Sequence, residues 1–85
     1  MSTMTMSNPD LAKVLFSSAL QASDRPTPSQ IRAAVADRLL ACPGRAPYTA
    51  AVAQEAGDHP ETYVARMRWA LAAVEQAYQP MLAAA

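Results

Sequence analysis

The sequence predicts a small all-α domain of four helices. Apolar residues make up 52% of the 85 positions and many are alanine, whereas glycine occurs only twice and aromatic residues are 6%. Alanine favours helices, while strands are enriched in β-branched and aromatic residues. In four segments the apolar residues recur at spacings of three and four, and proline, glycine or capping residues separate these segments. A chain of this length has one domain with a small core. We therefore expect residues 1–85 to form a single helical domain, with 1–7 frayed and 80–85 a tail.

The first predicted helix is apolar on two faces. Asn8 is a suitable N-cap, Pro9 fits the first helical position, and the segment 23–26 breaks the helix. One face carries Leu11, Val14, Leu15 and Ala22, and the other carries Phe16 and Leu20. Such a helix is expected to lie between neighbouring helices or to contribute to an oligomer contact.

The second predicted helix starts with a capping box. The hydroxyl of Thr27 can accept from the backbone N–H of Gln30, and the Gln30 side chain can reach back to Thr27. The apolar stripe that follows is interrupted by Arg38 and consists of Ile31, Ala34, Val35, Leu39 and Cys42. Cys42-Pro43-Gly44 is expected to end the helix.

The third and fourth predicted helices, within 47–78, are joined by a glycine turn. The third helix covers about 47–56 with Ala51, Val52 and Ala56 facing inward, and Gly57 then turns the chain with a positive φ. Asp58 or His59 caps the fourth helix, Pro60 lies in its first turn, and Pro80 ends it. Its predicted core face centres on Leu71 and comprises Tyr63, Val64, Met67, Ala70, Leu71, Val74 and Tyr78.

Charge and residue chemistry exclude several classes of function. The seven basic and seven acidic residues balance, with a net +2 in 1–46 and −2 in 47–85, so no overall field attracts nucleic acid or an anionic membrane. No apolar run reaches the roughly 20 residues of a membrane span, and no signal peptide precedes the domain, so we expect a cytoplasmic protein. His59 has no second ligand at metal-binding spacing, and Cys42 is best explained as a small buried side chain. Without paired carboxylates, a nucleophile motif or a phosphate loop, we expect no enzyme, no cofactor and no small-molecule substrate.

Residues 52–74 follow the pattern I-A-x-x-L-G-x-S-x-G-T-V-K-S-R-L-x-R-A-L-x-x-L at many positions. The matching positions are Val52, Ala53, Ala56, Gly57, Thr62, Tyr63, Arg66, Met67, Ala70, Leu71 and Val74. In these positions the segment resembles the helix-turn-helix of sigma-factor region four and related transcription regulators. The spacing suits two helices that cross steeply, with a glycine where the chain turns. The match covers roughly a quarter of the chain.

The resemblance implies binding to double-stranded DNA. Thr62 would donate to a phosphate, Arg66 would reach a base edge or phosphate, and Arg68 would hold the backbone. Departures from the pattern remove other contacts, because Val64 replaces a lysine, Ala65 a serine and Trp69 an arginine. His59-Pro60-Glu61 also replaces the usual small cap and glycine.

The alternative is a non-enzymatic protein-interaction module that forms a homodimer or binds another protein. Trp69 lies on the face of the fourth helix opposite the predicted core face, among alanines. This tryptophan is either covered by the first helix or part of an interface that includes Phe16 and Leu20. A positive surface around the start of the fourth helix would favour DNA binding, but Glu55, Asp58 and Glu61 oppose it.

Overall fold

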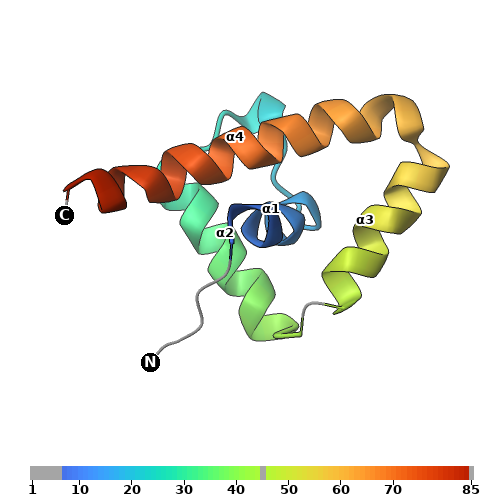
Figure 1. Ribbon diagram of the computed structural model, residues 1–85, viewed down its shortest axis with the longest axis horizontal. Helices are drawn as coiled ribbons and strands as arrows, with labels where there is room; N and C mark the ends of the chain where they lie inside the picture. Colours follow the sequence, from blue (N-terminus) through green and yellow to red (C-terminus); the bar gives the residue numbers. More distant parts are fainter. Residues whose placement is uncertain (1–6, 45, 85) are drawn as a thin grey trace.

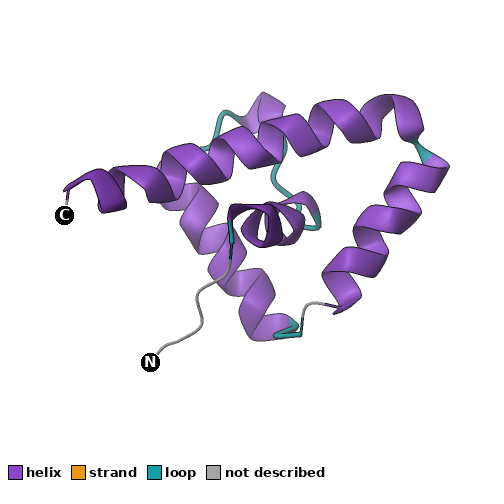
Figure 2. Cartoon of the chain, in the orientation of Figure 1, coloured by secondary structure: helices purple, strands orange, loops and turns teal. Residues whose placement is uncertain are grey.

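The described chain is all-helical, as the sequence predicts. The computed structural model describes residues 7–44 and 46–84. Its elements are α1 (Asn8–Phe16), the 3-10 turn η1 (Ala22–Asp24), α2 (Pro28–Ala41), α3 (Ala46–Asp58) and α4 (Pro60–Ala84). Figure 2 shows no strand in this part of the chain. The expectation that 1–7 is frayed falls almost wholly on 1–6, which lie outside the described residues.

Helix α1 lies at the centre of the domain. Figure 1 shows it nearly end-on, with α2, α3 and α4 arranged around it as three sides of a triangle. It packs most extensively against α4 and also contacts α2 and α3. Ala12, Val14, Leu15 and Phe16 are all buried. The two apolar faces of this helix are therefore explained by neighbours within the monomer.

Both ends of α1 differ from the prediction. The N-cap is Ser7, whose Oγ accepts from the backbone N–H of Asp10 at 3.3 Å, so Asn8 is the first helical residue. The helix ends at Phe16 instead of continuing to residue 22. The reason is local, because the Ser17 and Ser18 hydroxyls donate to carbonyls of the last turn at 2.7 and 2.6 Å.

Helix α2 starts as the sequence predicts. The Thr27 hydroxyl accepts from the Gln30 N–H at 3.2 Å, and the Gln30 side chain accepts from the Thr27 N–H at 2.8 Å. Ile31 and Val35 are buried against the core, and Cys42 is the C-cap residue after Ala41. The predicted capping box and apolar stripe are confirmed.

The glycine turn between α3 and α4 is not present. Gly57 lies inside α3 without a positive φ, and a Cβ at this position would meet nothing within 4 Å. Only His59 separates the two helices, and its carbonyl accepts from the N–H groups of Thr62 and Tyr63. Pro60, which has no N–H to satisfy, starts α4 without a longer loop. The two helices diverge from this corner on either side of α1 (Figure 1).

The buried face of α4 overlaps the predicted one but is not centred on Leu71. Of the predicted residues, Ala70 and Val74 are buried and Tyr63, Met67 and Tyr78 are half-buried against the core, whereas Leu71 is 38% and Val64 47% exposed. Ala77, outside the predicted face, is also buried. Small side chains face α1 and α2 because α4 packs against both of them, so the largest aliphatic residues do not mark the core. The prediction that Leu71 lies at the centre of the core is wrong.

Helix α4 also continues beyond its predicted end, through Pro80 to Ala84. Proline provides no N–H for the carbonyl of residue 76. Arg32 of α2 donates from Nη1 to the next carbonyl, Ala77 O, at 2.8 Å. The residues after Pro80 are alanine, leucine and methionine, which favour helix. The expected tail is therefore helical over 80–84.

Candidate functional site

Arg66 closes the C-terminal end of α1. Its Nη2 donates to Phe16 O at 2.7 Å and to Ser18 O at 3.0 Å, and its Nε donates to Phe16 O at 3.2 Å. The guanidinium also lies over the rings of Phe16 and Trp69, 5.2 and 5.3 Å from their centroids. Burial lowers the pKa of Arg66 below its ordinary value, yet the group stays charged at neutral pH. The arginine to which the helix-turn-helix resemblance assigns a base contact is here hydrogen-bonded to its own chain.

Tyr48 binds carbonyl groups at the C-terminal end of α2, as Arg66 does at the end of α1. Its hydroxyl donates to the carbonyl oxygens of Arg38, at 2.7 Å, and of Cys42. The Arg38 guanidinium lies 5.8 Å from the Tyr48 ring centroid, and its Nε is buried without a hydrogen-bond partner among the described residues. Burial raises the pKa of Tyr48 above 10.0, so the phenol keeps its proton at neutral pH. Side chains from distant elements thus satisfy carbonyls that glycine caps often serve.

The other two predicted DNA contacts are exposed, and Thr62 lies at a corner that carries acidic residues. Thr62 donates from its hydroxyl to His59 O at 3.3 Å, in the first turn of α4. Arg68 makes no hydrogen bond or ion pair with the described residues. Glu61 lies in the first turn of α4, and Glu55 approaches His59 Nε2 at 3.9 Å. Carboxylates at this corner oppose a phosphate backbone.

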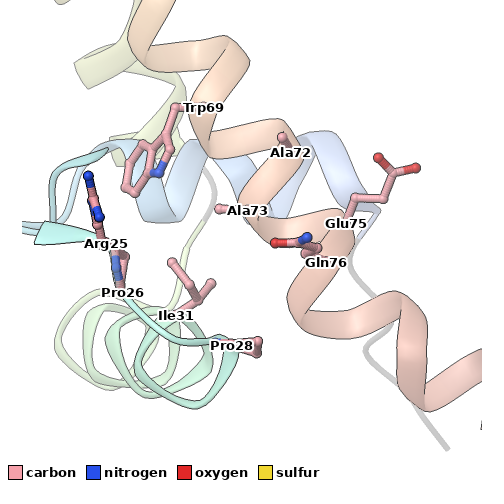
Figure 3. Close-up of a pocket in the computed structure, with 9 residues that line it drawn as sticks. All are labelled: Arg25, Pro26, Pro28, Ile31, Trp69, Ala72, Ala73, Glu75 and Gln76. Carbon is pink, nitrogen blue, oxygen red and sulfur yellow. The ribbon is translucent and has the colours of Figure 1, made fainter. Parts of the chain in front are cut away.

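Trp69 forms one wall of a groove between α4 and the segment that connects η1 to α2. The cavity has a volume of about 560 Å³. Its lining residues are Arg25, Pro26, Pro28, Ile31, Trp69, Ala72, Ala73, Glu75 and Gln76. Figure 3 shows Arg25, Pro26 and Trp69 at one end, with Glu75 and Gln76 farther along α4. The structure brings Trp69 together with residues that sequence spacing did not connect to it.

Arg25 adopts an uncommon backbone conformation at this groove. Its φ is 49° and its ψ 54°, and within the described residues it is the one non-glycine position with a positive φ. The left-handed region costs a residue with a Cβ roughly 1–2 kcal/mol. An arginine held there at the wall of a cavity is a candidate functional residue, because such strain is often retained at binding sites. No motif in the sequence marks it.

The two other predicted interface residues, Phe16 and Leu20, are largely covered by other residues of the same chain. Phe16 is 6% exposed, and its ring packs against Tyr63 with centroids 5.8 Å apart. Leu20 is half-buried against the core. Trp69 is also half-buried, with Arg66 over its ring. Little of Phe16 remains for a partner, whereas Trp69 still faces the groove.

Two other kinds of feature are absent from the described residues. In 7–44 and 46–84, no group of three or more histidine, cysteine, aspartate or glutamate side chains is placed to hold a metal ion. No helix in the same part of the chain has the length and hydropathy needed to cross a membrane. Comparison with known proteins found no matching family, curated protein or solved structure.

Proposed function

We propose that this protein is a non-enzymatic interaction module that binds a short segment of a partner protein in the groove beside Trp69. The single observation that carries the proposal is the cavity of about 560 Å³ with a tryptophan, an isoleucine and two prolines in its lining. Binding sites of this size are typically apolar with a few polar groups that orient the ligand. Tryptophan is also enriched among residues that dominate binding energy.

The charges near the groove indicate the chemistry of the partner. Arg25 lines the Trp69 end, and the Arg66 guanidinium lies over the Trp69 ring. Both groups are cationic, so an acidic side chain of the partner would be stabilised at this end. The expected partner segment carries an apolar side chain, which fills the space above Ile31, next to an aspartate or glutamate.

A displayed library of random peptides, selected on the immobilised protein, tests this proposal. Enriched peptides should combine an apolar residue with a neighbouring acidic residue. Gln76→Trp places a large side chain in the groove from an exposed position and should abolish their binding. Leu40→Trp adds the same side chain at the other end of α2, where Leu40 is 83% exposed, and should leave binding unchanged. Equal binding by both variants, or no enrichment of acidic peptides, would refute the proposal.

Arg25→Gly separates binding from stability. Glycine adopts a positive φ without the steric cost of a Cβ, so the variant should be as stable as the parent or more stable. Binding of the selected peptides should weaken by about tenfold, because the charge at the Trp69 end is removed. Unchanged peptide affinity in a folded Arg25→Gly variant would show that Arg25 does not contact the partner.

DNA binding is the second candidate, favoured by the exposure of Thr62 and Arg68 near the start of α4. The engagement of Arg66 with Phe16 O and Ser18 O leaves few cations for phosphate, so only modest affinity is expected. Binding to mixed-sequence DNA should then depend on salt, and Arg68→Ala should reduce the slope of log affinity against log salt by about 0.9. Absence of salt-dependent binding by the folded protein would exclude this candidate.

A further inference from the structure

The outward face of α4 carries an exposed stripe that α1 and α2 do not cover. Val64 and Leu71 are two of the three large apolar residues most exposed in the described chain, at 47% and 38%. They are seven residues apart, so they lie two turns apart on the same side of the helix. The small residues Ala65 and Ala72 are exposed next to them and are also seven residues apart. Small side chains allow a second helix to approach closely.

Two opposite charges on the same face have no partner within the part of the chain that the structure describes. Arg68 and Glu75 are both exposed, and neither makes a hydrogen bond or ion pair with the described residues. They too are seven residues apart, which exceeds the three- or four-residue spacing at which helical charges pair. Figure 3 shows the Glu75 carboxylate directed away from the other residues of the groove. Both charges are therefore available to another molecule.

We propose that this face binds the same face of a second copy of the chain, with the two α4 helices antiparallel. A twofold axis between Leu71 and Ala72 places Leu71 of each copy opposite Ala72 of the other. The same axis places Arg68 of each copy opposite Glu75 of the other. At 1.5 Å per residue, the two ion pairs lie roughly 10 Å apart, on either side of the apolar centre.

The charge pattern selects this orientation. In a parallel pair in register, Arg68 would face Arg68 and Glu75 would face Glu75, which is unfavourable. The antiparallel arrangement converts both repulsions into attractions. One helix face is small compared with the roughly 1,200 Å² of the smallest stable interfaces, so the dimer is weak and concentration-dependent. Its face of α4 shares Ala72 and Glu75 with the lining of the Trp69 groove, but the dimer does not depend on peptide binding there.

Charge-reversal variants of Arg68 and Glu75, measured by sedimentation equilibrium, test the proposed dimer. Arg68→Glu and Glu75→Arg should each weaken self-association by about tenfold, because both symmetry-related pairs become repulsive. The double variant restores opposite charges across the axis and should recover the parent's dissociation constant within about threefold. Asp37→Arg makes the same change in net charge as Glu75→Arg at an exposed position of α2 outside the groove lining, and it should have little effect.

Two results would overturn the proposal. One is a parent protein that remains monomeric at the highest concentration reached. The other is a double variant that shows the helical circular dichroism of the parent but does not recover dimerisation. Since Arg68 lies outside the groove lining, Arg68→Glu should keep its affinity for the selected peptides. Failure of the dimer and failure of the peptide site are thus measured separately.

Discussion

Arg66→Ala should destabilise the fold strongly, because Arg66 connects α4 to the end of α1. The substitution removes hydrogen bonds to Phe16 O and Ser18 O and two ring contacts, with Phe16 and Trp69. Hydrogen bonds from a charged donor contribute about 1.5–3 kcal/mol when buried, and exposed cation–π contacts about 0.5–1 kcal/mol. Arg66 is only half-buried, so water can replace part of this interaction. We expect a loss of about 2–4 kcal/mol in unfolding free energy.

Such a loss is large for this domain. Domains of 85 residues have a total stability of roughly 4–13 kcal/mol. The predicted change corresponds to a lower Tm by roughly 10–25 °C. Urea denaturation followed by circular dichroism at 222 nm would measure it, with Arg68→Ala as the control. Arg68 makes no described contact, so its removal should change stability by less than about 0.5 kcal/mol.

The same variant distinguishes a structural arginine from a DNA-contacting one. If Arg66→Ala unfolds at the same urea concentration as the parent, the contacts at the end of α1 do not stabilise the protein in solution. If that stable variant has also lost salt-dependent DNA binding, Arg66 has the role that its position in the helix-turn-helix pattern implies. Arg66→Lys should be intermediate, because lysine retains the charge without the planar set of donors.

Three further predictions concern the fold. Gly57→Ala should raise the unfolding free energy by about 0.5–1 kcal/mol, because Gly57 has space for a Cβ within α3; destabilisation in the same urea assay would indicate a turn instead. Val74→Ala should cost about 2 kcal/mol and Leu71→Ala less than about 1 kcal/mol, since Val74 is fully buried and Leu71 is not; the reverse order would mean that α4 faces the other way. Burial raises the pKa of Tyr48, so its contribution is complete below pH 10 and is lost as the pH rises through the folded value. Stability measured from pH 8 to 12 should therefore fall less steeply in Tyr48→Phe, and an unchanged slope would contradict the assignment.

The proposed peptide site and the proposed dimer interface lie on neighbouring sides of α4. The side of α4 with Ala70, Val74 and Ala77 is buried, and the side with Trp69 and Ala73 borders the α2 segment. The remaining side faces outward. A domain of this size can present two binding surfaces on one helix because small residues are sufficient to pack the third side.

Local signals at single elements were predictable from the sequence. The Thr27 and Gln30 capping box, the buried Ile31 and Val35 stripe and the position of Pro60 at the start of α4 are all confirmed. Each depends on residues within one or two helical turns. Capping hydrogen bonds and apolar periodicity act over this range, so they can be recognised without knowing the neighbouring helices.

The centre of the face that α4 buries could not be predicted in this way. Ala70 and Val74 lie on the predicted face and are buried, but hydrophobicity also favours Val64 and Leu71, which are exposed, and it misses the buried Ala77. The choice depends on the space that α1 and α2 leave, because close packing selects for shape as well as for apolar character. The turn between α3 and α4 could not be placed from the sequence for the same reason. Gly57 is compatible with a turn, but the chain turns at His59 instead.

The sequence by itself determined an all-α chain, the beginnings of α2 and α4, and the balance of charge. Alanine content, capping residues and proline positions act locally and are sufficient for these features. Only the tertiary structure decided that Arg66 bonds to the end of α1 and that Arg25 and Trp69 line one groove. These residues are 44 to 50 positions from their partners in the chain. No periodicity connects positions so far apart, and only the packing of the helices brings them together.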